Sequence, residues 1–199
     1  MRVSKEKAAE NRAALLRAAS ELFRQRGIDG VGVAEVAKAA GLTHGALYAH
    51  FASKDALVAE AFSYGFERNL EGTRASAPDE RRSFEDHLTD LFSIRARDNL
   101  TGGCPMTASA SEIGRQGEDV SARFASAFER VANALEESLE DQIPQPERRR
   151  LAIATVAAQI GAIVVSRAVA KANNSLSDEV LRSTRATISE AGKIGPRRS

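Results

Sequence analysis

Hydrophobic and polar positions alternate along most of this chain at the spacing of amphipathic helices. Near the amino end, the pattern predicts a helix from about Lys5 to Arg26, which Gly27 would end. Its buried stripe consists of Leu15, Ala18, Ala19, Leu22 and Phe23. Runs of Val and Ile occur only inside longer apolar helical stretches, and alanine is abundant. The pattern therefore predicts an all-α protein.

The same periodicity continues through the rest of the chain. It predicts helices over about 53–70, 80–98, 119–141, 147–172 and 177–191. Pro105 suits the first turn of a further short helix, and Pro144 and Pro146 would end the helix that starts at 119. The segment 72–79, GTRASAPD, is small and polar and contains a proline, so we expect a linker there.

Two short helices are expected between Gly27 and Leu57. The first carries Val33, Val36, Ala37 and Ala40 on one side. Gly41 can take the left-handed conformation that closes a helix, and the Thr43 hydroxyl can cap the next one, whose Leu47 and Phe51 should face inward. Two short helices joined by a three-residue turn form a helix-turn-helix, here at about 32–51, whose second helix enters the DNA major groove. Residues 43–48 should then face DNA.

The segment GLTHGALYAHFASKDAL, residues 41–57, resembles the signature of the TetR/AcrR family of one-component transcriptional regulators. Tyr48, Phe51, Lys54 and Leu57 stand at the matching places. The resemblance implies a three-helix DNA-binding domain, residues 8–68, followed by a helical ligand-binding and dimerisation domain, residues 80–192. One departure is Gly32, where the family usually has a Ser or Thr that touches a phosphate; here that contact is absent or made by the backbone amide.

The expected DNA contacts fall into two kinds. Thr43 and His44 are the best candidates for reading base edges. Tyr48, His50 and Lys54 would meet the phosphate backbone, although Tyr48 could instead be a half-buried aromatic and His50 an ordinary surface histidine. The full predicted set is Gly32, Val33, Thr43, His44, Gly45, Ala46, Tyr48, His50 and Lys54.

Charge supports a nucleic-acid partner for the amino-terminal part alone. The 199 residues carry 28 Lys and Arg against 27 Asp and Glu, a net charge of +1. Residues 1–56 hold nine of the basic and six of the acidic residues, a balance of +3, which leaves −2 for the rest. The larger part of the chain should therefore do something other than bind phosphate.

Nothing in the sequence predicts export or a membrane partner. The amino end has no uninterrupted apolar run of the signal-peptide kind. The longest apolar run, Leu151 to Val165, is interrupted by Thr155 and Gln159, and we expect it to be too short to span a bilayer. The single cysteine, Cys104, excludes an intramolecular disulfide and fits a reducing compartment, so a cytoplasmic location is expected.

The helix predicted at 147–172 is apolar over most of its circumference, so it must be covered on more than one side. Its apolar and small residues include Ile153, Val156, Ala157, Ile160, Gly161, Val164 and Ala168. It is either the core helix of a monomer or, as we favour, part of a homodimer bundle shared with the last helix. A two-fold dimer would place two recognition helices about one DNA turn apart and would require a palindromic operator.

A pocket for an apolar small-molecule inducer is expected between the middle helices. Its predicted lining is Phe84, Leu88, Phe92, Cys104, Met106, Phe124 and Phe128, with Ser109, Ser111, Glu112, Arg115 and Gln159 as polar handles, although each is as easily a core residue. Cys104 lies between Gly103 and Pro105 at a helix start, where the helix dipole favours a thiolate that senses electrophiles or oxidants. The alternative for Cys104 is a small buried hydrophobe.

We therefore expect a homodimeric regulator, most simply a repressor, that leaves its operator when an inducer binds. The alternatives are a DNA-binding regulator without a ligand and a helical enzyme. The enzyme is disfavoured because the sequence has neither a glycine-rich phosphate loop nor a Cys or His cluster at metal spacing, and His44 and His50 miss the i, i+4 geometry of a helical metal pair. No catalytic residue, metal or cofactor is expected.

Overall fold

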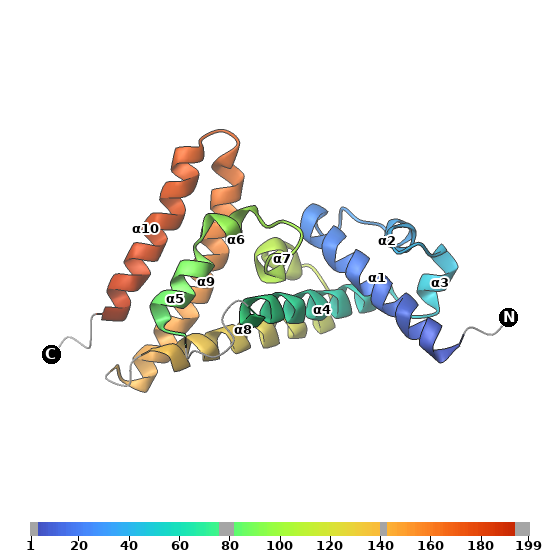
Figure 1. The fold of residues 1–199 in the computed structure, drawn as a ribbon, viewed down its shortest axis with the longest axis horizontal. Helices are drawn as coiled ribbons and strands as arrows, with labels where there is room; N and C mark the ends of the chain where they lie inside the picture. The colour runs from blue at the N-terminus through green and yellow to red at the C-terminus, as the bar shows by residue number, and fades with distance from the viewer. Residues whose placement is uncertain (1–3, 76–81, 140–142, 194–199) are drawn as a thin grey trace. The chain divides into compact units, whose positions relative to one another are not determined.

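The computed structural model describes residues 4–75, 82–139 and 143–193. These residues form helices and connecting turns without a β-strand (Figure 1), so the all-α prediction is confirmed for them. The helices are α1 (Lys5–Arg26), α2 (Val33–Ala39), α3 (His44–Tyr48), α4 (Lys54–Ala75), α5 (Phe84–Leu91), α6 (Ile94–Asp98), α7 (Pro105–Ile113), α8 (Glu118–Ser138), α9 (Gln145–Ala170) and α10 (Asn174–Lys193).

The chain divides into two compact units. The first unit contains residues 1–76 and 100–125, and the second contains residues 77–99 and 126–199. Helix α7 and the start of α8 therefore belong with the amino-terminal helices, which the predicted domains 8–68 and 80–192 did not anticipate. Those domain boundaries themselves stay a prediction.

In the first unit, α1 packs against α4, α2 and α7, and α2 packs against α3. The interior of this unit includes Leu15, Ala19, Val36, Ala37, Leu47, Phe51 and Leu57, each at most 2% exposed. The predicted bounds of α1 are confirmed. Ser4 begins the helix because its Oγ accepts from the amide of Lys7, and Gly27 ends it at φ +79°.

The predicted turn chemistry is also confirmed. The amides of Gly41 and Leu42 donate to the carbonyls of Lys38 and Ala37, which is a Schellman closure of α2, and Gly41 has φ +71°. Thr43 Oγ1 accepts from the amide of Ala46 at 3.3 Å and so caps α3. Two glycine- and hydroxyl-dependent turns thus set where the short helices begin and end.

Several predicted boundaries are wrong. The helix expected over 80–98 is two helices, because Ser93 Oγ accepts from the amide of Ala96 and starts α6 after α5 has ended. Residues 72–75 of the expected linker continue α4, while 76–79 lie outside the described residues. Helix α8 ends at Ser138, before either proline, and Pro146 lies in the first turn of α9 because a proline there loses no helical hydrogen bond.

In the second unit, α9 packs against α10 and α6, and α5 packs against α10 and α6. Arg97, 7% exposed, ties these helices together: its Nη1 donates to Ser177 Oγ at 2.8 Å and to Asp178 Oδ1 at 2.7 Å. Arg167 Nε donates to the carbonyl of Arg97 at 2.7 Å. Hydrogen bonds that Arg97 donates to Asp98 and Asp178 raise its pKa against the effect of burial, so the guanidinium stays charged inside the unit.

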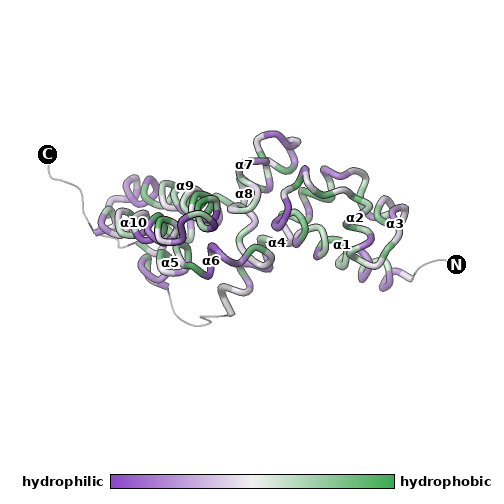
Figure 2. Tube along the Cα trace, turned by 90° about the horizontal axis from the view of Figure 1, so that it is seen from above, coloured by the Kyte–Doolittle hydropathy of each residue, from purple (hydrophilic) through white to green (hydrophobic). Residues whose placement is uncertain are grey.

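Helix α9 is longer than its apolar run suggests. By length and composition alone its 26 residues could cross a membrane, with a mean hydropathy of 1.7 in the most apolar window (Figure 2). The core helix of a soluble protein passes the same test, and 39% of that window is buried. The apolar run 151–165 is only the middle of this helix, which extends from Gln145 to Ala170, and a single helix of this kind is weak evidence for a membrane span.

Candidate nucleic-acid interface

Helix α3 presents one face inward and one outward. Leu47 is fully buried and Phe51, just after the helix, is 2% exposed. Thr43, His44 and Gly45 are exposed on the opposite side. Because the apolar residues fix the helix against α2 and the rest of the unit, the polar residues are held on a rigid outer face.

Two ring side chains share that outer face. His44 and Tyr48, four residues apart, meet edge to face with their ring centroids 5.2 Å apart. Tyr48 is nevertheless 48% exposed, so about half of its surface faces solvent. Its contact with a phosphate stays a prediction.

The remaining predicted contacts surround α3. Gly32 caps α2 without a side chain and has an extended backbone (φ −86°, ψ 150°), and Val33 and Ala46 are half-buried. His50 and Lys54 are half-buried, and Lys54 forms no ion pair with any residue that the structure describes. Its charge is therefore available to an anion.

Ion pairs fix the surroundings of this face. Arg12 of α1 pairs with Glu60 of α4, and its guanidinium lies 5.2 Å from the ring centroid of Phe51. Arg26 pairs with Glu35 at the opposite end of α1. These cations are neutralised within the unit, so they hold α1, α2 and α4 together and contribute little free charge to the surface.

The residues predicted to line the ligand pocket are divided between the two units. In the second unit Phe84, Leu88 and Phe92 are buried, and the Phe84 ring lies 3.0 Å from where a Cβ on Gly192 would stand, so it is a packing contact between α5 and α10. Phe128 is half-buried. In the first unit Met106 is buried, Cys104 is half-buried, and Phe124 meets Phe62 at 5.9 Å between ring centroids. Their meeting in one pocket stays a prediction.

Ser109, Glu112 and Arg115, three of the predicted polar handles, already form hydrogen bonds within the protein. Ser109 Oγ donates to the carbonyl of Pro105, and Arg115 Nη1 donates to the carbonyl of Ser111. Gln159 is 4% exposed within α9. Glu112 is the main surprise: its carboxylate binds the backbone between α1 and α2, with both oxygens 3.1 Å from the Ile28 amide nitrogen.

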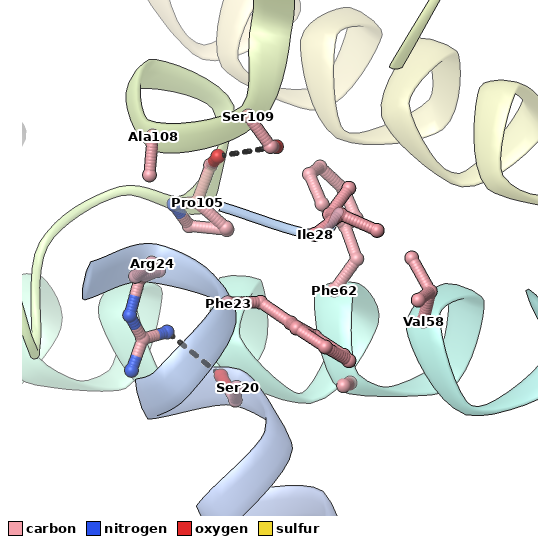
Figure 3. Close-up of a pocket in the computed structure, with 10 residues that line it drawn as sticks. Ser20, Phe23, Arg24, Ile28, Val58, Phe62, Pro105, Ala108 and Ser109 are labelled. Atoms are coloured by element: carbon pink, nitrogen blue, oxygen red, sulfur yellow. Dashed lines mark hydrogen bonds between the residues drawn. The ribbon is translucent and has the colours of Figure 1, made fainter. Parts of the chain in front are cut away.

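A pocket lies among α1, α4 and α7 inside the first unit (Figure 3). It encloses about 290 Å³ of empty space, its open mouth included. Its lining is Ser20, Phe23, Arg24, Ile28, Val58, Ala61, Phe62, Pro105, Ala108 and Ser109. Of these residues only Ser109 was predicted near a ligand, as a polar handle, because the packing of α7 onto α1 that brings the others together leaves no signal in the sequence. Among the described residues, no group of three or more His, Cys, Asp or Glu is placed to hold a metal.

Two family models match separate parts of the chain. Residues 15–61 match the model described as bacterial regulatory proteins, tetR family, and residues 82–178 match the C-terminal domain of LmrA/YxaF-like transcriptional regulators. The first match covers the helix-turn-helix whose outer face is described above. The chain belongs to the TetR family.

The chain is also similar in sequence to individual TetR-family proteins. The chain is 44% identical over 59 residues to the HTH-type transcriptional regulator AcrR of Shigella flexneri, covering 30% of this chain and 27% of that one. It is 32% identical over 102 residues to the HTH-type transcriptional repressor BepR of Brucella suis biovar 1 (strain 1330), covering 49% of each. The chain thus spans at most about half the length of these two relatives.

The fold is also shared with solved TetR structures. A TetR transcriptional regulator from Chloroflexus aurantiacus J-10-FL superposes with a TM-score of 0.74 at 21% identity, covering 96% of this chain and 98% of that one. The family consists of transcriptional regulators, so the chain is a TetR-family transcriptional regulator with a helix-turn-helix DNA-binding domain and is not an enzyme.

Proposed function

We propose that this TetR-family protein is a cytoplasmic, homodimeric repressor that binds a palindromic operator and leaves it when a small molecule binds. The observation that carries the proposal is the outer face of α3, where Thr43, His44 and Tyr48 are exposed over the buried Leu47. In helix-turn-helix proteins the second helix enters the major groove with its amino-terminal residues at the base edges. BepR, a relative named as a repressor, supports the sign of the regulation.

Within this proposal, Thr43 and His44 read base edges, while Tyr48, His50 and Lys54 bind phosphates. The slim Gly45 and Ala46 allow close approach, and a Cβ on Gly45 would meet no protein atom within 4 Å, so that space is open towards the partner. Gly32 and Val33, at the start of α2, offer backbone amides to a phosphate.

Operator titrations at several salt concentrations test this division. Lys54→Ala should weaken binding about equally on all sequences and lower the salt slope by about one, because one phosphate contact is lost. His44→Ala should change which operators are preferred. The control is Lys7→Ala, which removes an exposed α1 cation already paired with Glu10 and should leave the salt slope unchanged. The reverse pattern, sequence-selective loss from Lys54→Ala, would refute the assignment.

The homodimer is supported by the exposed face of α9. Ile153, Val164 and Val165 are 39%, 41% and 48% exposed, and Leu176 at the start of α10 is 41% exposed. Ala157, Gly161 and Ala168 lie exposed at matching helical spacing, so the face is apolar and flat enough for close helix packing. Such a face is covered most simply by the same face of a second copy.

Sedimentation analysis tests the dimer. Val164→Asp should convert the protein to monomers, because two carboxylates would be buried at the two-fold axis. Ser121→Asp places the same charge on an exposed position of α8 and should leave the dimer intact. A Val164→Asp variant that sediments like the wild type would remove this face as the interface.

Cys104 is the proposed point of attack for an electrophilic inducer. It caps α7 without a side-chain hydrogen bond to the helix, is followed by Pro105, and is half-buried. Operator release by quinones or oxidants should disappear in Cys104→Ser while DNA binding is kept. Unchanged release would leave Cys104 as a packing residue, and a gel shift against a panel of small molecules would then separate a ligand-controlled regulator from one without a ligand.

A further inference from the structure

The pocket among α1, α4 and α7 combines an apolar wall with one cation. Phe23, Ile28, Val58 and Phe62 gather on one side of it, and Arg24 lies at its edge beside Ser20 (Figure 3). All of these residues belong to the first unit, so the pocket is part of the DNA-binding unit itself. A mostly apolar hollow with one convergent polar group is the usual form of a small-molecule site.

Arg24 is held in place but is not neutralised. Its Nε donates to the carbonyl of Thr101 at 2.6 Å and its Nη1 donates to Ser20 Oγ at 2.8 Å. Within the described part of the chain, Nη2 makes no hydrogen bond and no carboxylate pairs with the guanidinium. Burial lowers the pKa of Arg24, with Glu21 and other charges acting against that effect. A partly desolvated cation that has an acidic neighbour in Glu21 but forms no ion pair favours an anion from outside the chain.

The structure also fixes where the guanidinium lies. A Cβ on Gly65 of α4 would collide with both Arg24 Nη1 and Ser20 Oγ, so this helix has a glycine where the Arg24–Ser20 pair crosses it. The position of the cation therefore depends on Gly65, and an added methyl group would displace it without removing its charge.

We propose that this pocket binds a small monocarboxylic acid with a single ring or a short branched chain, whose carboxylate lies on Arg24. The planar guanidinium matches a carboxylate, and the apolar wall matches the hydrocarbon part. The empty space of about 290 Å³ includes the open mouth, so the enclosed part is smaller, and we therefore take benzoate, a single ring with one carboxylate, as the probe. This site adjoins part of the lining predicted for the inducer, because Pro105 follows Cys104 and Phe62 contacts Phe124, but its occupancy can be measured without DNA.

Calorimetric titration with benzoate, in the absence of DNA, tests the proposal, with benzyl alcohol as the neutral probe of the same size. Benzoate should bind and benzyl alcohol should bind about tenfold more weakly or not at all, since the charged hydrogen bonds are lost. Arg24→Met and Ala108→Leu, which fills the pocket from α7, should each weaken benzoate at least about tenfold. Arg17→Met removes an exposed cation from the same helix and should bind benzoate like the wild type.

Gly65→Ala is the second variant, because it keeps the charge and improves helix propensity, so it folds even where Arg24→Met does not. It should also weaken benzoate. Methyl spectra should show Ile28 and Val58 shifting with benzoate. Three results would overturn the proposal. The first is that benzoate does not bind at about 10 mM, where a site of millimolar affinity is mostly filled. The others are that Arg24→Met and Gly65→Ala both bind benzoate unchanged, or that the methyl groups whose signals shift lie in the second unit. Because no DNA is present, these outcomes leave the proposed operator binding untouched.

Discussion

The Glu112 carboxylate at the end of α7 accepts the backbone amide of Ile28, with both oxygens 3.1 Å from the nitrogen, and lies 3.4 Å from the amide of Asp29. The contact joins residues 84 positions apart and fixes the turn between α1 and α2. Glycine at position 27 allows this contact for two reasons. Its backbone takes φ +79°, which other residues rarely adopt, and a Cβ there would clash with Glu112 Oε1 at 2.8 Å. A side chain from α7 therefore supports the helix-turn-helix from behind.

Glu112→Ala should lower the free energy of unfolding by about 1 to 3 kcal/mol, because the amides of Ile28 and Asp29 lose a charged acceptor in a half-buried place. Urea unfolding measures the change. Glu112→Gln, which keeps one acceptor oxygen, should lose less. Glu71→Ala removes an exposed carboxylate from α4 and should change stability little. Equal effects from Glu71→Ala and Glu112→Ala would contradict the role given to this contact.

Gly32→Ser should restore the missing cap of α2. The position is extended and a Cβ would meet nothing within 4 Å, so serine fits without strain. Its hydroxyl can accept from the first turn, which adds a few tenths of a kcal/mol of stability, and can also donate to a phosphate. Thermal unfolding and operator titration measure the two effects. If α2 starts at the DNA as we propose, affinity rises; weaker binding would argue that this end of α2 faces away from DNA.

Gly41→Ala and Gly45→Ala should act in opposite directions. Gly41 has φ +71°, which costs an alanine about 1 kcal/mol, so the variant should unfold at lower urea. Gly45 lies inside α3 with free space around it, so alanine should raise stability by up to about 1 kcal/mol. Gly45→Ala should nevertheless bind the operator more weakly, because its methyl group occupies the space proposed for DNA. Tighter binding by the more stable variant would contradict that placement.

His87 should make stability depend on pH. Burial in α5 lowers its pKa, and Arg82 lowers it further, against smaller effects of Asp90 and Asp86. The unfolded chain then takes up a proton at a higher pH than the folded protein, so this contribution is present above the ordinary histidine pKa of about 6.5 and is lost as pH falls towards the folded value. His87→Gln should therefore lose less stability than the wild type between about pH 7.5 and pH 5.5, as urea unfolding would show. An identical loss in both proteins would contradict a partly buried His87 that stays neutral.

Local chemistry in the sequence was enough to predict the helix-turn-helix. The bounds of α1, the left-handed Gly41 and the Thr43 cap depend on contacts within a few residues, so a short stretch of sequence is enough to predict them. The burial of Leu47 and Phe51 follows from helical periodicity in the same way. The break at Ser93 was missed because a serine inside an apolar pattern reads equally well as a helical residue or as a cap.

The sequence alone thus determined that the chain is helical, that it carries a TetR-type helix-turn-helix, and which side of α3 is apolar, because each depends on neighbours in the chain. Only the tertiary structure decided that α7 packs with the amino-terminal helices, that Glu112 holds the turn at Ile28, and that Arg24 lines an apolar pocket. The contacts of Arg24 with Thr101 and of Glu112 with Ile28 join residues at least 77 positions apart, and the pocket is lined by three separate helices. No pattern within one helix encodes such a contact, since it depends on how helices distant in sequence pack together.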